Sequence, residues 1–460
     1  MDMRFGRIFP LFMLAALFAG CATTNTSAGG QSTQAGRNAL SAAAELARND
    51  ASLNGQARID NARQIERLLA AIDNATLARD AASLPAGDPL YPFAGRALLN
   101  RGLPLPRPFE RGANWRFDLN NRPAAERDGY RPPVKLAVLL PLSGQLATAS
   151  APVRDGLLAG YYGETRRRPE INFYDTVGTA AGALSAYANA TAAGSDFVIG
   201  PLGRDEVSAV FGQSALAVPV LALNRGTSPP PAGNAGFSLA PEDDGIIAAE
   251  YLLGRERRTA LVISGNDDSG RRAAAAFRER FSERGGNVVD TISVSDTPGS
   301  IASNLASASQ RGLDAVFLAM KGSTARAVAP QLALAGLSGK SRVGTSQLLS
   351  GTGKPEQDSA LDGIVFPTEV WTARGLGGLP PASMAGASMP TARGPAARLF
   401  AFGYDAWMLT AYLEKLATGT NVQLKGATGE LSLDGFGNVL RTPAWSTFSG
   451  GRSVPVGGGG

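Results

Sequence analysis

Apolar and polar residues follow two periods along most of the chain. Short apolar runs bounded by turn residues, such as KLAVLLP at 135–141 and DFVIGP at 196–201, alternate with stretches whose apolar residues recur at helical spacing. The uninterrupted runs are typical of strands buried on both faces, and the longer stretches are typical of amphipathic helices. Strands separated by helices of roughly 10 to 15 residues predict βαβ units and parallel sheets from residue 134 onward.

The alternation falls into two consecutive series. The first ends with VPVLALN at 218–224, and the second opens with PEDDGIIAAEYLL at 241–253, a predicted helix whose acidic first turn matches the positive end of the helix dipole. Two series predict two sheets and hence two lobes. A loop without periodicity is predicted at 375–395, a long helix at 397–416, and then a hairpin whose turn spans 434–438.

The segments that flank these lobes differ from them in character. Residues 37–102 show helical spacing, as in ARQIERLLAAID, and predict a short helical segment. Residues 103–133 are rich in Pro and Arg and predict an extended linker that packs against the next domain through Trp115 and Phe117. The glycine-rich residues 450–460 predict a disordered tail.

The first residues have the pattern of a secretory signal peptide over residues 1–20. Basic residues precede a short apolar stretch, and small residues lead to Cys21. The sequence LFAGC at 17–21 is similar to a bacterial lipobox, which predicts cleavage before Cys21 and a diacylglycerol on its thiol. An ordinary signal peptide with an incidental cysteine is the alternative. The small polar residues of 21–36 predict a flexible tether.

Composition narrows the chemistry that the chain can perform. The 460 residues include one cysteine and no histidine, which excludes a histidine-based triad, a histidine-ligated zinc site and an internal disulfide. The net charge is +5, but basic and acidic residues are interspersed, so nucleic acid is not an expected partner. The chain has no GxxxxGK[ST] loop and no carboxylate pair that stands out for acid–base catalysis. We therefore expect no enzyme, no catalytic residue, no metal and no cofactor.

Several motifs together resemble a known fold. The order of five motifs resembles that in proteins of the type I periplasmic-binding-protein fold. The motifs are PLSG at 141–144, VIGPL at 198–202, VPVLALN, FGYDAW at 402–407 and GATGELSLDGFGNVLR at 426–441. Within that fold, the last motif resembles the tail of the LpoA-type penicillin-binding protein activators. The resemblance covers about residues 134–449 and implies an α/β protein with two doubly wound parallel-sheet lobes joined by a hinge.

The connectivity of this family implies three crossings between the lobes. Lobe one would take about 134–239 and 366–420, and lobe two would take about 240–365 and 421–449, with the final hairpin in lobe two. Longer members of the family carry a large helical-repeat domain before this fold, whereas only about one hundred residues precede Val134 here.

The resemblance also suggests where a ligand would lie in the first lobe. In amino-acid receptors of this fold the loop after the first strand holds the ligand carboxylate, and Ser143, Gly144 and Gln145 occupy that position here. The alternative is that they only form the tight turn that the topology needs. Asn224 and Arg225 end a strand and could face the same cleft, but Arg225 could equally be a solvated or ion-paired surface residue.

The second lobe lacks one feature of the receptors. They usually carry a tyrosine before a glycine in the first loop of this lobe, whereas Ser269 precedes Gly270 here. Asp267 or Asp268 could bind an ammonium group, or one of them could cap the helix that begins near Gly270. Tyr404 on the long helix could reach the cleft. Whether the cleft holds a small molecule is left open by the sequence.

The resemblance implies an outer-membrane lipoprotein that faces the periplasm. Its expected role is to activate or regulate a class A penicillin-binding protein, a peptidoglycan synthase, through direct binding. Ala22, where inner-membrane lipoproteins carry Asp, favours the outer membrane. The rival hypothesis is a periplasmic receptor that binds an amino acid or short peptide for transport or sensing.

Overall fold

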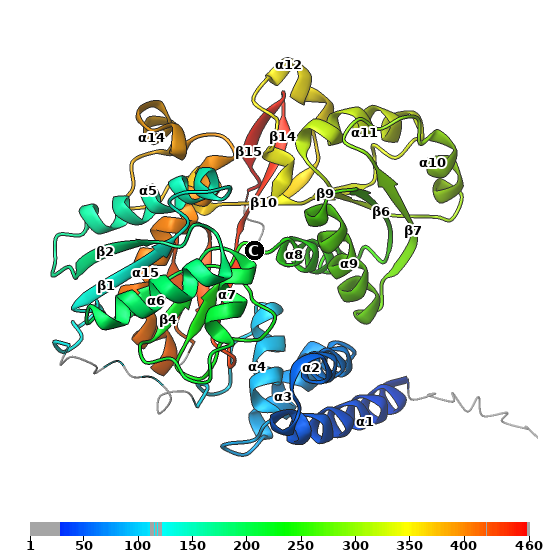
Figure 1. Cartoon of the computed structure of the whole chain (residues 1–460). Coiled ribbons are helices and arrows are strands. Elements are labelled where there is room, and N and C mark those ends of the chain that lie inside the picture. Colours follow the sequence, from blue (N-terminus) through cyan, green and yellow to red (C-terminus); the bar gives the residue numbers. More distant parts are fainter. Residues whose placement is uncertain (1–27, 111–114, 116, 118–121, 420, 458–460) are drawn as a thin grey trace, which may run out of the picture.

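The computed structural model describes residues 28–110, 115, 117, 122–419 and 421–457. Two α/β lobes lie side by side, and the amino-terminal helices, blue in Figure 1, lie at the lower end of the pair. The predicted signal peptide and Cys21 lie outside the described residues. Within the described part of the chain, no helix is both long and apolar enough to cross a membrane.

The first lobe is built on an eight-stranded sheet with the order β11-β12-β13-β5-β4-β3-β1-β2. Its strands are β1 (Lys135–Leu140), β2 (Glu170–Asp175), β3 (Phe197–Ile199), β4 (Val220–Ala222), β5 (Ala235–Phe237), β11 (Leu424–Lys425), β12 (Glu430–Leu433) and β13 (Asn438–Thr442). The six strands from β13 to β2 run parallel.

Helices cover both faces of this sheet. They are α5 (Ala147–Gly163), α6 (Ala180–Ala192), α7 (Arg204–Phe211) and α15 (Ala396–Thr418). Leu136 and Val138 of β1 pack in one apolar cluster with α5 and α15, whereas Ala137 and Leu139 pack in another with α6 and α7. The alternation of side chains along a strand therefore explains why β1 is apolar at every position after Lys135.

The second lobe repeats this plan with a seven-stranded sheet of order β15-β14-β10-β9-β8-β6-β7. Its strands are β6 (Thr259–Gly265), β7 (Asn287–Val294), β8 (Ala315–Ala319), β9 (Ser341–Gly344), β10 (Val365–Thr368), β14 (Ala444–Ser449) and β15 (Arg452–Pro455). Helices α8 (Pro241–Leu253) and α9 (Asp268–Glu283) cover one face, and α10 (Ala302–Ser309) and α11 (Gly322–Leu334) cover the other.

The chain crosses between the two sheets three times: after β5, after β10 and after β13. This is the connectivity that the resemblance implies, and the predicted fold class is confirmed.

The placement of the final hairpin in lobe two is wrong. Strands β12 and β13 form the predicted antiparallel hairpin, but β13 joins the first sheet by pairing parallel to β5, where Val439 lies opposite Phe237. Leu431 and Leu433 consequently bury their side chains in the core of the first lobe. Only β14, after the third crossing, returns to the second sheet.

The disordered tail predicted over 450–460 is wrong for β15. Residues 452–455 pair antiparallel with β14 at the edge of the second sheet. The turn between the two strands is held because both carboxylate oxygens of Asp362 accept hydrogen bonds from the backbone N–H groups of Gly450 and Gly451, each at 2.9 Å. A glycine-rich sequence can therefore be ordered when a partner strand and an anchoring carboxylate are close.

Four helices precede the lobes, namely α1 (Ala28–Asn49), α2 (Gly55–Ala70), α3 (Asn74–Ser83) and α4 (Tyr91–Asn100). The flexible tether predicted over 21–36 is wrong for 28–36, because α1 already begins at Ala28 and no proline interrupts the stretch. The linker that follows packs as predicted: Trp115 and Phe117 are buried in the first-lobe core with their rings stacked 5.1 Å apart.

The helical segment contacts both lobes. On the first lobe, Arg96 Nε of α4 lies 3.0 Å from Asp434 Oδ2, and the rings of Phe93 and Phe436 meet at 4.6 Å. On the second lobe, Arg284, which follows α9, donates weakly through Nη1 to the backbone oxygen of Ala70 in α2 at 3.5 Å. These contacts connect the two lobes through a third body in addition to the hinge.

Candidate functional site

The loop after β1 contacts a carboxylate of the protein itself. Asp175, at the end of β2, accepts hydrogen bonds from Ser143 Oγ at 2.6 Å and from the backbone N–H groups of Leu142 and Ser143 at 2.9 and 3.3 Å. The N–H of Val177 donates to the same carboxylate at 2.8 Å. The hydroxyl and N–H of Ser143, which are predicted to hold a ligand carboxylate, are thus engaged with Asp175.

The shape of this loop depends on Gly144. Its φ of +78° lies in the left-handed region, and a Cβ atom there would lie 2.8 Å from the backbone oxygen of Val177. Gln145 is exposed on the same loop. Ser143 and Gly144 therefore form the tight turn between β1 and α5, which is the second of the two roles that the sequence allows them.

Asn224 and Arg225 also have partners within the protein. Asn224 donates from Nδ2 to the backbone oxygen of Leu202 at 2.9 Å and accepts the N–H of Arg225 at 2.9 Å. Arg225 Nη2 lies 2.6 Å from Asp243 Oδ1, on the first turn of α8. Since Asp243 belongs to the second lobe, Arg225 connects the lobes as an ion-paired residue.

The two remaining candidates lie apart from the first-lobe loop. Asp267 caps α9, because its side chain accepts the N–H of Gly270 at 2.9 Å. Tyr404 packs against an apolar cluster that includes Trp371 and Phe400. A Cβ atom added to Gly378 would lie 3.1 Å from the Tyr404 hydroxyl, so the hydroxyl is next to that glycine. Burial raises the pKa of the Tyr404 hydroxyl.

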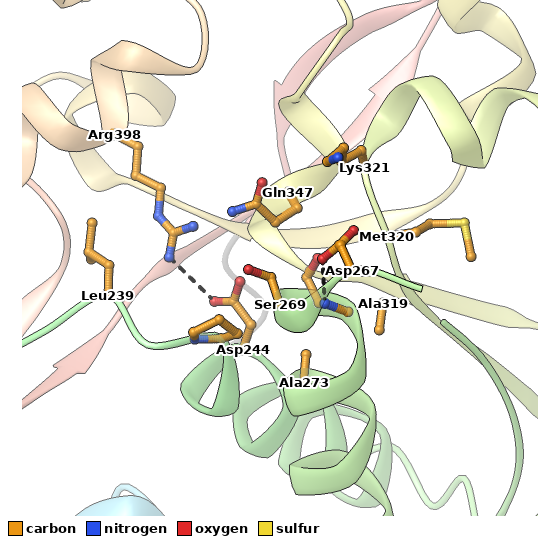
Figure 2. A pocket seen from close by; sticks show the side chains of 13 residues that line it. Leu239, Asp244, Asp267, Ser269, Ala273, Ala319, Met320, Lys321, Gln347 and Arg398 are labelled. Carbon is orange, nitrogen blue, oxygen red and sulfur yellow. Dashed lines mark hydrogen bonds and ion pairs between the residues drawn. The ribbon is translucent and has the colours of Figure 1, made fainter. Parts of the chain in front are cut away.

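A small pocket lies between the lobes, at the carboxyl ends of β6, β8 and β9. Figure 2 shows Asp244, Asp267, Lys321, Gln347 and Arg398 around it. Its volume is about 50 Å³, whereas pockets for drug-sized ligands are typically about 300 to 1,000 Å³. The space suits a few water molecules better than an amino acid. Of the predicted cleft residues, Asp267 alone lines it.

A buried cluster of four charges adjoins this pocket. The second lobe supplies Asp244 and Glu369, each with a side chain 2% exposed, and the first lobe supplies Arg398 and Arg441. Asp244 Oδ1 lies 4.0 Å from Arg398 Nη2 and 3.7 Å from Arg441 Nη2, and Arg398 Nε lies 3.4 Å from Glu369 Oε1. Asp244 Oδ2 accepts two hydrogen bonds from Ser346.

We call these four residues, Asp244, Glu369, Arg398 and Arg441, the interlobe cluster. The sequence alone does not predict it. The acidic run that contains Asp244 predicts only a favourable helix start, and Arg441 attracts notice only as part of a resemblance. Burial lowers the pKa of the Arg441 guanidinium, as does the neighbouring charge of Arg398. Two carboxylates from one lobe facing two guanidinium groups from the other neutralise one another, so the cluster favours a fixed arrangement of the lobes.

Two motifs of the family resemblance, FGYDAW and GATGELSLDGFGNVLR, touch each other. Asp405 of FGYDAW is fully buried, and its carboxylate accepts hydrogen bonds from the N–H groups of Ala427 and Thr428 at 2.5 and 2.8 Å and from the Thr428 hydroxyl at 2.5 Å. Burial raises the pKa of Asp405 to about 6. The motifs therefore reflect a structural contact between α15 and the start of the hairpin.

Two lobes of doubly wound sheets, three crossings and a pocket between the lobes define a protein of the type I periplasmic-binding-protein class. Within that class, a model of the LppC putative lipoprotein family matches residues 130–451, so the chain belongs to this family of the bacterial envelope. The resemblance to the LpoA-type activators is confirmed by the relatives described next.

The chain is 26% identical over 361 residues to the penicillin-binding protein activator LpoA of Photobacterium profundum. This alignment covers 70% of this chain and 57% of that protein. The chain thus spans little more than half the length of this curated relative. Full-length LpoA of Haemophilus influenzae superimposes with a TM-score of 0.60 at 19% identity, over 92% of this chain and 82% of that one. A putative branched-chain amino acid ABC transporter of Chromobacterium violaceum superimposes with a TM-score of 0.54 at 28% identity, over 68% of this chain and 100% of that one.

Proposed function

We propose that this protein is an outer-membrane lipoprotein that faces the periplasm and activates a class A penicillin-binding protein in peptidoglycan synthesis through direct protein binding. The observation that carries the proposal is the contact of Ser143 with Asp175: the Ser143 hydroxyl and N–H, which would hold a ligand carboxylate, hold a carboxylate of the protein itself. The name of the P. profundum relative, a penicillin-binding protein activator, supports the same role.

The proposed mechanism uses the exterior of the two lobes. Lipidated Cys21 would attach one end of the chain to the outer membrane, and the helical segment would supply reach. The paired lobes would then bind the synthase better in its active conformation than in its inactive one, which shifts its population toward activity. The protein itself is proposed to have no catalytic activity.

The proposed partner can be tested with the soluble form, residues 22–460. We expect it to retain a class A penicillin-binding protein from detergent-solubilised membranes and to raise the rate of glycan polymerisation by the purified synthase at least two-fold. The Ser143→Ala variant should stimulate equally well, because the loop after β1 has no ligand to lose. Absence of both retention and stimulation would contradict the proposal.

The solute receptor is the second candidate, because the C. violaceum protein, a putative branched-chain amino acid ABC transporter, matches along its whole length. A bound ligand raises the melting temperature by mass action. Under the activator proposal, a panel of amino acids at millimolar concentration leaves the melting temperature unchanged. A clear increase that disappears in Ser143→Ala would favour the receptor.

The proposed lipid anchor gives a separate prediction. The Cys21→Ser variant should lose incorporation of labelled palmitate and move from the membrane fraction to the soluble periplasm, because one thiol carries the acyl chains and each buried methylene contributes about 0.8 kcal/mol. Fractionation followed by immunoblotting checks this. Equal membrane retention of the variant would show that an anchor other than Cys21 is used.

A further inference from the structure

A second and much larger hollow lies outside the interlobe pocket. Its volume is about 590 Å³, and it shares no lining residue with that pocket. The second sheet contributes β14, β15 and the end of β10, and the opposite wall comes from the segment 382–397, which contains α14 (Ala382–Ser388) and the start of α15. Figure 1 shows α14 and the β14–β15 pair in the upper part of the molecule. We name this hollow the α14 groove.

The segment that forms the outer wall is more ordered than its sequence predicts. A loop is expected over 375–395, but α14 and a short 3-10 helix, Pro390–Ala392, occupy much of it. The side chain of Trp371 donates from Nε1 to the backbone oxygen of Pro380 at 2.8 Å, which fixes the entry to α14. The groove therefore has two built walls.

Small residues line most of the α14 groove. Ala373, Ala387 and Gly394 are examples, and none of the lining residues is aromatic. Sugar rings are usually recognised by stacking on aromatic faces, and large apolar side chains need deep apolar pockets. Neither feature is present among the residues that line the groove, which argues against a sugar ring or a large apolar side chain as its occupant.

The polar groups in the groove have spare hydrogen-bonding capacity. Ser446 is 1% exposed and lines the groove, and its hydroxyl has no hydrogen-bond partner among the described residues. A hydroxyl that lines a hollow and makes no hydrogen bond to the protein can bond to water or to a ligand. Ser383 and Ser453 add two more lining hydroxyls. The exposed Arg393, at the rim, makes no ion pair with any residue that the structure describes.

We propose that the α14 groove binds an extended peptide with small side chains and a free carboxylate, such as an alanine-rich peptide. Arg393 would pair with the carboxylate, since a guanidinium group donates to both of its oxygens. The serine hydroxyls would bond to the peptide amides, and the Ala and Gly walls would leave room for methyl side chains. The site does not depend on the proposed contact with a synthase.

The proposal can be tested by calorimetric titration of residues 22–460 with N-acetyl-trialanine that has a free carboxylate. We expect saturable binding, and at least ten-fold weaker binding of the same peptide with a carboxamide end. Arg393→Gln should weaken binding of the free acid at least ten-fold. The matched variant Arg204→Gln, which changes an exposed arginine on the first lobe, should leave it unchanged.

A second pair of variants tests the location. Ala387→Trp places a large ring in the groove from an exposed position of α14 and should abolish binding, whereas Met384→Trp places the same ring at a position of α14 that does not line the groove and should not. The melting temperature of each variant reports on its fold. No saturable binding at millimolar peptide, equal binding of acid and amide, or unchanged affinity in both Arg393→Gln and Ala387→Trp would overturn the proposal.

Discussion

Asp175 and Asp405 are carboxylates that the protein binds with its own N–H and hydroxyl groups. Asp175 is at the surface, and the hydrogen bond from Ser143 is the first cause that holds its pKa below the usual range. Asp405 is fully buried, and removal from water raises its pKa to about 6 although three donors face it. Similar hydrogen bonding therefore leaves opposite pKa shifts, because the cost of burial differs between the two sites.

Asp405 gives a prediction with a defined dependence on pH. Its pKa in the folded state lies above the ordinary value of 3.8, so the folded state binds more protons than the unfolded state between those two values. The stability that this group contributes is complete below about pH 4 and is lost as the pH rises through about 6. The difference in free energy of unfolding between the parent and Asp405→Asn should therefore decrease from pH 4 to pH 7.

Urea unfolding of both proteins at several pH values measures that difference, in which the titration of other residues cancels. At pH 5 the variant should be less stable by about 2 to 3 kcal/mol, since the NH₂ group of the amide cannot accept the N–H of Thr428, whereas an oxygen of the protonated carboxyl still can. A difference that stays constant or increases with pH would contradict the raised pKa.

Helix α15 and helix α5 approach each other through glycines. A Cβ atom on Gly403 would lie 1.9 Å from the backbone oxygen of Val153, and one on Gly156 would lie 1.9 Å from that of Phe400. Each glycine thus faces the backbone of the other helix. Such a distance cannot be relieved by rotating a side chain, so the two helix axes would have to separate.

We therefore expect Gly403→Ala to lower the free energy of unfolding by about 2 to 3 kcal/mol, as overpacking does in a tight core. The matched control is Gly163→Ala at the end of α5, where the nearest atom to an added Cβ is the oxygen of Gly378 at 4.0 Å. That change should leave stability within about 0.5 kcal/mol. Thermal unfolding of both variants checks the prediction, which equal melting temperatures would refute.

The elements themselves could be predicted where their signal is local. The apolar run of β1, the amphipathic α9 and the hairpin of β12 and β13 follow from spacing alone. The order of α14 and β15 could not be predicted, because α14 consists mostly of small residues and β15 is a four-residue strand whose turn is held by Asp362, far away in the chain. The same reason hides the partner of Ser143, which lies 32 residues away.

Three sets of contacts hold the two lobes together in the whole molecule. The first set is the interlobe cluster, the second is the pair of Arg225 and Asp243, and the third is made by the amino-terminal helices, which touch both lobes. A receptor that opens and closes would break the interlobe pairs in each cycle. The burial of the interlobe cluster favours a molecule that keeps its lobes in one arrangement, as expected of a docking body.

Arg441 gives a prediction at this scale. Arg441→Met leaves Asp244 buried with Arg398 as its remaining cation, and losing one partner of a buried ion pair typically costs about 3 to 5 kcal/mol. We expect a lower free energy of unfolding and a larger radius of gyration in small-angle X-ray scattering, because the lobes can then separate.

The control for this variant is Arg278→Met, at an exposed arginine on α9 that makes no ion pair within the described part of the chain. It should change neither measurement. If Arg441→Met is destabilised but keeps the parent radius of gyration, the cluster stabilises the fold without holding the lobes together.

The amino-acid sequence by itself determined the two α/β lobes, the helical segment before them and the motifs of the family. These features depend on the spacing of apolar residues, which is a local property of the chain. The tertiary structure alone decided which sheet receives the hairpin, which charges meet between the lobes and which candidate ligand-binding groups are already occupied. These outcomes depend on contacts between residues far apart in the chain, whose pairing leaves no periodic trace in a single sequence.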